Sequence, residues 1–338
     1  MASTGRELVW QTLRLETPVR APRQLWYLPW AEIHYPRELR TIQEQYPPDI
    51  VSAPGFHREP LPSHGCPTDL GTYIDEFGCE FINIQEGVIG EVKHPQIKDW
   101  DRDADTVRFP EEHLTIDRDK INAWCEGKDT FILAGCCPRP FEQLQFLRGS
   151  ADLYTDLLVQ PKALTAFMKR LHAFYCRVLE RWAATEVDAL TFMDDWGSQA
   201  SLLISPELWR CVFKPMYRDY IAIAHGAGKA VFMHSDGHIL SIFPDLVEMG
   251  LDAVNSQLFC MGLEKLTPFA GKITYWGEID RQHILAEGTP EDARRAVRAI
   301  YAHLWKKGGC IAQCEFGPGA RPDTVAAVFD AWNTLATG

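Results

Sequence analysis

Side chains able to do chemistry follow five apolar segments of the chain, each at the point where the segment ends. They comprise carboxylates, one imidazole, amides and a thiol: Asp194, Asp195, His234, Asp236, Asn255, Gln257, Glu278, Asp280, Cys314 and Glu315. An acidic cluster of this kind is electrostatically costly unless a cation, protons or basic side chains offset it. Zinc accepts nitrogen, oxygen and sulfur ligands, so this set of donors favours a divalent metal site.

The most specific pair in this set is His234 and Asp236. Side chains alternate along a β-strand, so these two residues share one face of their segment. Glu315 or Cys314, from another segment, would complete the ligand set. By the same alternation, only one of Asp194 and Asp195 can point in that direction, and the pattern leaves open which one.

Eight short apolar runs in the chain read as buried parallel strands, and helical patterns separate most of them. The runs are residues 25–30, 49–54, 129–136, 189–196, 229–235, 252–258, 273–279 and 309–314. Eight such strands predict a (β/α)₈ TIM barrel, whose active site lies at the carboxyl ends of the strands. An open doubly wound sheet is the alternative, but no GxGxxG fingerprint follows the first strand.

The chain is predicted to form a single domain, residues 1–338, with one inserted segment. Ser205-Pro206-Glu207 and Thr289-Pro290-Glu291 have the residue types of helix starts. Residues 55–127 lie between the second and third predicted strands, and the alternation around Gly87 indicates a β-hairpin. We expect this insertion to cover one end of the barrel.

Composition narrows the classes of partner. The 338 residues include 34 Lys and Arg against 46 Asp and Glu, a net charge of −12. This balance argues against nucleic acid or an anionic membrane surface as the main partner. The sequence shows neither a membrane-spanning apolar run nor a signal-peptide core, so a cytoplasmic location is expected. The ten cysteines form no CxxC pair, and oligomeric state is left open.

Several blocks of the chain resemble the uroporphyrinogen decarboxylase superfamily. The block from Met193 to Ile221 is similar to the family's fourth-strand signature, and HSDGHILSIFPDLVEMGLDAVN is similar to its fifth and sixth strands. WGEID at residues 276–280 and CEFGPGARPDTV near the C-terminus resemble the seventh- and eighth-strand turns. Arg23-Gln24 followed by Tyr27-Leu28-Pro29 is similar to a short segment of the decarboxylase.

The resemblance implies one of two activities. The superfamily contains the decarboxylase and the corrinoid (cobalamin)-dependent methyltransferases, some of which bind zinc through a His-x-Cys motif and a second cysteine. The matching positions here are His234, Asp236 and Glu315, with Cys314 adjacent. A methyltransferase acting on a small molecule or thiol is therefore our main prediction. The chain has no DxHxxG cobalamin signature, so the corrinoid would be carried by a separate partner protein.

Decarboxylation of a tetrapyrrole is the alternative that the resemblance leaves open. The decarboxylase's substrate carries eight carboxylates, which an acidic rim would repel, and Arg23 matches only one of the family's anion-binding arginines. A non-catalytic ligand-binding barrel is a further alternative.

Each candidate residue has an expected role under the main prediction. Asp194, Asp195 and His234 would be catalytic, with one of the two aspartates positioning the substrate or acting as general acid/base. The substrate-binding residues would be Arg23, Trp26, Trp196, Gln257 and Glu278. The metal ligands would be His234, Asp236, Glu315 and Cys314.

Overall fold

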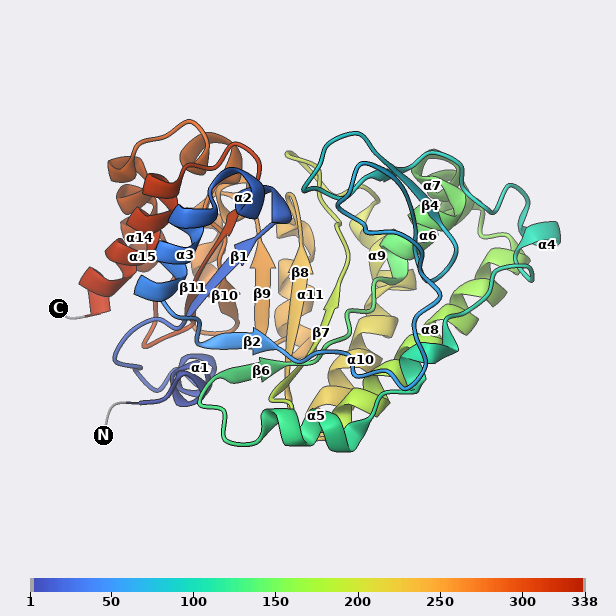
Figure 1. The fold of residues 1–338 in the computed structure, drawn as a ribbon. Helices are drawn as coiled ribbons and strands as arrows, with labels where there is room; N and C mark the ends of the chain where they lie inside the picture. The colour runs from blue at the N-terminus through green and yellow to red at the C-terminus, as the bar shows by residue number, and fades with distance from the viewer. Residues whose placement is uncertain (1–2, 337–338) are drawn as a thin grey trace.

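The computed structural model describes residues 3–336, and its centre is an eight-stranded parallel sheet (Figure 1). The strands are β1 (Arg23–Tyr27), β2 (Ile50–Ser52), β6 (Phe131–Leu133), β7 (Ala189–Met193), β8 (Ala230–Ser235), β9 (Ala253–Ser256), β10 (Thr274–Trp276) and β11 (Cys310–Phe316). They follow one another in the order β1-β11-β10-β9-β8-β7-β6-β2. The two end strands meet where the Asp49 amide donates to the Arg23 carbonyl at 2.8 Å. The predicted TIM barrel is thus confirmed as a nearly closed barrel, and one strand overlaps each predicted run; β1 begins before the first run, whose last two residues start α2.

Helices surround the barrel. They are α1 (Gly5–Leu13), α2 (Pro29–His34), α3 (Pro36–Gln45), α6 (Pro140–Arg148), α7 (Ser150–Val159), α8 (Lys162–Ala183), α9 (Pro206–Val212), α10 (Lys214–Gly226), α11 (Phe243–Met249), α12 (Leu258–Met261), α13 (Leu263–Leu266), α14 (Pro290–Leu304) and α15 (Pro322–Ala336). Short turns complete the set: η2 (Leu240–Ile242), η3 (Thr267–Phe269) and the π-helical η4 (Arg281–Leu285). The expected caps are present, since the Ser205 and Thr289 side chains accept the amides of Leu208 and Asp292. No helix among residues 3–336 is long and apolar enough to cross a bilayer.

The segment between β2 and β6 holds a small antiparallel sheet of β3 (Gly71–Ile74), β4 (Glu80–Asn83) and β5 (Glu91–Val92). The predicted hairpin is the β4–β5 pair, and β3 adds a strand that the sequence pattern did not reveal. Short helices α4 (Trp100–Asp103), η1 (Glu111–Leu114) and α5 (Arg118–Cys125) follow. Phe81 on β4 packs against Phe146 on α6, with ring centroids 5.0 Å apart. The segment therefore lies beside α6 and α7, as Figure 1 shows.

Two apolar layers hold the barrel together. The inner layer fills the amino-terminal half of the barrel. Its side chains include Phe131, Phe232 and Ile311, and helix α1 adds Val9. Trp10 packs edge-on against Phe131 at 5.4 Å, so α1 closes the amino-terminal end of the barrel. The outer layer lies between strands and helices. Because these side chains fill the amino-terminal half, a ligand would enter at the carboxyl ends of the strands. We call this end the mouth of the barrel; the inward-facing residues at the strand ends line it.

Candidate functional site

A group of three potential ligands lies where β7 and β8 end. The ligand atoms of Asp195, His234 and Asp236 all lie within 4.8 Å of one another. The His234 Nε2 is 3.5 Å from an Asp195 oxygen and 3.7 Å from an Asp236 oxygen. Residues 234 and 236 follow the same strand, and Asp195 comes from its neighbour. The structure thus brings together the His-x-Asp pair and one of the two candidate aspartates.

Asn255 sets the tautomer of His234. The Asn255 side-chain nitrogen donates to the Trp276 carbonyl and to the Gln313 side chain, so its oxygen must face His234 Nδ1, 2.7 Å away. A carbonyl-type oxygen accepts only, and Nδ1 therefore carries the hydrogen. In the neutral imidazole this leaves the Nε2 lone pair directed at the two carboxylates. A ring nitrogen held in this way is the form of histidine that binds metals.

Two features of these three residues suit a divalent cation: the spacing of their ligand atoms, and a carboxylate oxygen that has no hydrogen-bond partner among the described residues. Two ligands about 2.0–2.1 Å from a tetrahedral zinc lie about 3.3 Å apart, close to the two distances from Nε2. One Asp236 oxygen is buried without a hydrogen-bond partner among the described residues. An anionic oxygen facing a lone pair is unfavourable until a cation or a proton comes between them. The group therefore offers three nitrogen and oxygen ligands to a cation.

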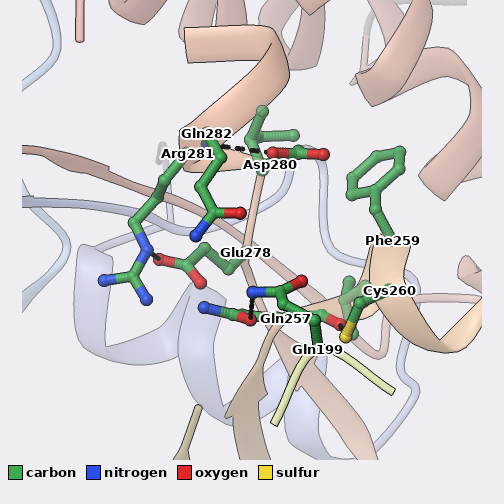
Figure 2. A pocket seen from close by; sticks show the side chains of 10 residues that line it. Gln199, Gln257, Phe259, Cys260, Glu278, Asp280, Arg281 and Gln282 are labelled. Carbon is green, nitrogen blue, oxygen red and sulfur yellow. Dashed lines mark hydrogen bonds and ion pairs between the residues drawn. The ribbon is translucent and has the colours of Figure 1, made fainter. Parts of the chain in front are cut away.

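On the opposite side of the mouth, Arg281 connects three carboxylates. Its nitrogens lie 3.1 Å from Glu278 and 3.0 Å from Glu315, and it donates to the second oxygen of Asp236. Asp280 caps the start of η4 by accepting the amides of Gln282 and His283, and this turn directs Arg281 towards Glu278 (Figure 2). The chain thus provides its own countercharge for this side of the mouth.

Burial raises the pKa of two carboxyl groups near the site. The Glu278 side chain is only 2% exposed, and its desolvation raises the pKa to about 8, although Arg281 opposes the shift. Desolvation also raises the pKa of Glu142 to about 7, and the nearby Asp195 charge adds to the shift while Arg139 opposes it. Both groups can therefore hold a proton near neutral pH, as a general acid must.

A cavity of about 520 Å³ opens above the inner core. His234 lies on its wall, together with Trp26 and Trp276. Trp26 lies 5.4 Å from the His234 ring and 5.0 Å from Trp276, ring centroid to ring centroid. The predicted pocket residue Trp26 is thus in the mouth, and the cavity has the size and apolar lining of a small-molecule site.

A much smaller pocket, about 30 Å³, adjoins the Arg281 side of the mouth (Figure 2). Gln257 and Glu278, both predicted to line the substrate site, lie on its wall. Gln257 accepts a hydrogen bond of 3.3 Å from Gln199. This volume holds two or three water molecules at most, since a water needs roughly 10–15 Å³.

Asp194 and Trp196 do not lie in the mouth, which corrects their predicted roles. Asp194 is fully buried and accepts the amides of Phe141 and Glu142, both at 2.8 Å, and the Tyr217 hydroxyl at 2.6 Å. It caps helix α6 from below the site. Trp196 is also fully buried, stacked 4.1 Å from Phe141. Both side chains are packed in the layer between the barrel and the helices and are not exposed to the mouth.

Three further candidates lie away from the proposed ligand group. Cys314 is fully buried in the outer apolar layer, because Glu315 takes the inward position on β11. Glu315 is in the mouth but is paired with Arg281. Arg23 begins β1, at the end of the barrel opposite the mouth, where its guanidinium donates to Asn333. Neither Cys314 as a ligand nor Arg23 as a substrate contact agrees with these positions.

Three residues of the site were not assigned by sequence reasoning: Asn255 as the partner of His234, Arg281, and Glu142. Asn255 had a usable signal, because β8 and β9 pair in parallel with His234 opposite Asn255. No sequence pattern placed Arg281 or Glu142 in the site. Their direction depends on the π-helical turn and on the start of α6, neither of which a hydrophobic pattern reveals.

Sequence comparison identifies the family. The sequence profile of the uroporphyrinogen decarboxylase (URO-D) family matches residues 56–335. The chain therefore belongs to this family. No curated protein matches the chain by sequence.

Solved structures show the same fold. A methyltransferase from Methanosarcina mazei superposes with a TM-score of 0.69 at 16% identity, covering 98% of this chain and 99% of that protein. A B12-independent methionine synthase from Shewanella sp. W3-18-1, in complex with selenomethionine, superposes with a TM-score of 0.42 at 12% identity, over 64% of this chain and 66% of that one. At these identities the likeness to the first concerns the fold alone, and the second is too distant to carry an argument.

Proposed function

We propose that this protein is a methyltransferase that moves a methyl group between a small substrate or thiol and a corrinoid carried by a partner protein. The observation that carries the proposal is the Asp195–His234–Asp236 group, in which a histidine lone pair and two carboxylates converge at the mouth of a barrel. Membership of the decarboxylase family and the fold shared with a methyltransferase support it. Tetrapyrrole decarboxylation needs positive charge around the substrate, whereas this rim gathers several carboxylates and leaves one Asp236 oxygen without a partner among the described residues.

Asp195, His234 and Asp236 would hold a zinc ion, which would supply a Lewis acid for the methyl-carrying group or its acceptor. Asn255 keeps the His234 ring in the tautomer that this task requires. Trp26 and Trp276 line the adjoining cavity and would give a substrate an apolar surface to pack on.

Glu278 has the properties of a proton donor. It is protonated at neutral pH because its pKa is about 8, and it lies at the rim of the mouth beside Arg281. Demethylation of an ether or amine produces a basic leaving group, and a neutral carboxyl nearby can protonate it.

Metal analysis tests the proposal. Protein purified without chelators should hold about one equivalent of zinc per chain, and His234→Ala should lose most of it. Cys314→Ala is the matched control, because this buried thiol faces away from the group. A metal-free protein with full methyl-transfer activity would refute the metal site. Tight ligand binding without any turnover would instead favour a non-catalytic barrel.

Decarboxylation of a tetrapyrrole is the second candidate, favoured by the family profile. It predicts release of carbon dioxide from uroporphyrinogen by chelator-treated protein. Arg23 lies at the far end of the barrel, so Arg23→Gln should not alter any such activity beyond its effect on stability. Arg281 and Arg139 would then supply positive charge to a bound acid.

A further inference from the structure

A second cavity, of about 120 Å³, lies between the barrel and the inserted segment. Its walls come from Glu76, Phe77 and His113 of the insertion, from the residues after β6, and from helix α8. Both this cavity and the mouth cavity are lined by Gly135, Cys136 and Cys137. The two spaces therefore adjoin at the turn after β6, and one ligand could extend from the His234 side into the second cavity.

Arg139 is the unusual residue of this cavity. Its guanidinium has five N–H donors, yet it makes no hydrogen bond to another residue of the 3–336 range. The nearest carboxylate oxygen, on Glu142, is 3.8 Å away, beyond hydrogen-bond distance. The side chain is 36% exposed although it lines a cavity. Burial lowers the pKa of Arg139, but nearby acidic groups, Glu142 first, raise it further, so the cation persists.

The other acidic groups nearby already have partners. Glu76 faces His113, 3.4 Å from its Nε2. The first amides of helix α6 are used by Asp194, so they add no donors. Arg139 is thus the free hydrogen-bonding cation of the cavity among the described residues.

Three aromatic side chains form one part of the wall, next to Gln143 and Val178. Phe174 lies 5.6 Å from Tyr175 and 6.0 Å from Phe77, ring centroid to ring centroid. All three residues line the cavity. A cation with open donors beside these aromatic rings matches a carboxylate attached to a flat body, because the guanidinium fork binds carboxylates through two parallel bonds.

We propose that Arg139 binds the carboxylate of an organic-acid substrate whose body extends past Cys137 towards His234. This assignment deepens the proposed function by naming a substrate class, and it rests on that function only for the reaction at the His234 end. The carboxylate site itself depends on neither metal nor methyl transfer. Its test is therefore separate from the test of the proposed function.

Binding of sodium benzoate, measured by calorimetry on the intact protein, tests the site. Benzoate should bind saturably, and Arg139→Gln should weaken its binding tenfold or more, since charge-assisted bonds are lost. Arg139→Lys should bind benzoate with intermediate affinity, because lysine keeps the charge but not the fork. Benzamide, which lacks the charge, should bind weakly and respond little to either change.

Arg170→Gln is the matched control. It also removes one cationic charge, but Arg170 lies on the surface, paired with Asp105. It should leave benzoate binding unchanged. Equal benzoate binding by wild type and Arg139→Gln, or no saturable binding by wild type, would overturn the proposal.

Alkylation of Cys137 gives an independent position for the ligand. Cys137 is exposed at the junction of the two cavities, whereas Cys211 is exposed on helix α9. Benzoate should slow labelling of Cys137 by iodoacetamide, read by peptide mass spectrometry, and leave Cys211 unaffected. Unchanged labelling of Cys137 under saturating benzoate would place the ligand elsewhere and contradict the proposed position.

Discussion

The two sides of the barrel mouth treat their carboxylates differently. On the β10–β11 side, Arg281 lies between Glu278, Glu315 and one oxygen of Asp236. On the β7–β8 side, Asp195 and the other Asp236 oxygen face the Nε2 of His234, with no lysine or arginine of the described chain between them. The first side is neutralised by the chain itself. The second is balanced only when a proton or an added cation is present, and this difference locates the proposed metal site.

Asp194 is a third kind of carboxylate, buried next to the mouth with hydrogen-bond donors from the chain to both of its oxygens. Replacing it with alanine leaves two amides of α6 and the Tyr217 hydroxyl without their acceptor in a buried place. We expect Asp194→Ala to lower the free energy of unfolding by about 4 kcal/mol, more than any substitution in the mouth itself. Chemical denaturation measures it. Asp195→Ala, at an adjacent but partly exposed position, should change stability by less than about 1 kcal/mol. Similar losses in both variants would contradict the structural role of Asp194.

Arg281 is the test of the neutralised side. Arg281→Gln removes the cationic partner of Glu315 and of one Asp236 oxygen, while Glu278, protonated near neutral pH, loses a polar contact rather than a countercharge. Removing one member of a buried ion pair costs about 3–5 kcal/mol, and because Arg281 is 26% exposed we expect about 3 kcal/mol. Urea denaturation in the presence of a chelator measures the loss. Arg321→Gln, which removes an exposed Arg321–Asp323 pair, is the control and should cost under about 1 kcal/mol. A loss no larger than that of the control would show that Arg281 does not balance this side.

Glu278 predicts how stability on this side depends on pH. Its pKa is raised from 4.5 to about 8, so between these values the folded protein keeps a proton that the unfolded chain releases. The free energy of unfolding therefore falls as pH rises through this window, by at most about 1.4 kcal/mol per pH unit. Glu278→Gln should remove this contribution, and its stability relative to wild type should rise by roughly 3 kcal/mol from pH 5 to pH 8. Denaturation midpoints of both proteins across this range measure it. Parallel pH curves would show that Glu278 ionises normally.

The barrel could be predicted from the sequence because a buried parallel strand appears as a short apolar run and a helix start as a capping residue. Each of the eight apolar runs overlaps one strand, and the capping residues Ser205 and Thr289 start the helices as expected. Strand β3 was missed, because it is exposed or half-buried along its whole length and has no continuous apolar pattern.

The site could be predicted only in part. The alternation of β7 passes from Thr191 through Met193 to Asp195, which would have selected Asp195 over Asp194 as the inward residue. The same rule places Glu315 inward and Cys314 outward. Arg281 was beyond such reasoning, because a π-helical turn after β10 decides its direction.

Asp195→Asn tests the unbalanced side and should have the smallest effect on stability. Without metal, removing one of two carboxylates that face His234 relieves repulsion, so we expect a gain of up to about 0.5 kcal/mol or no change. With zinc, wild type should gain stability by mass action, by about 2.7 kcal/mol at a hundredfold excess over Kd, whereas the variant should gain less. Thermal unfolding with chelator and with added zinc measures both terms. If zinc stabilises the two proteins equally, Asp195 is not a ligand. If zinc stabilises neither, a proton rather than a metal balances this side of the mouth.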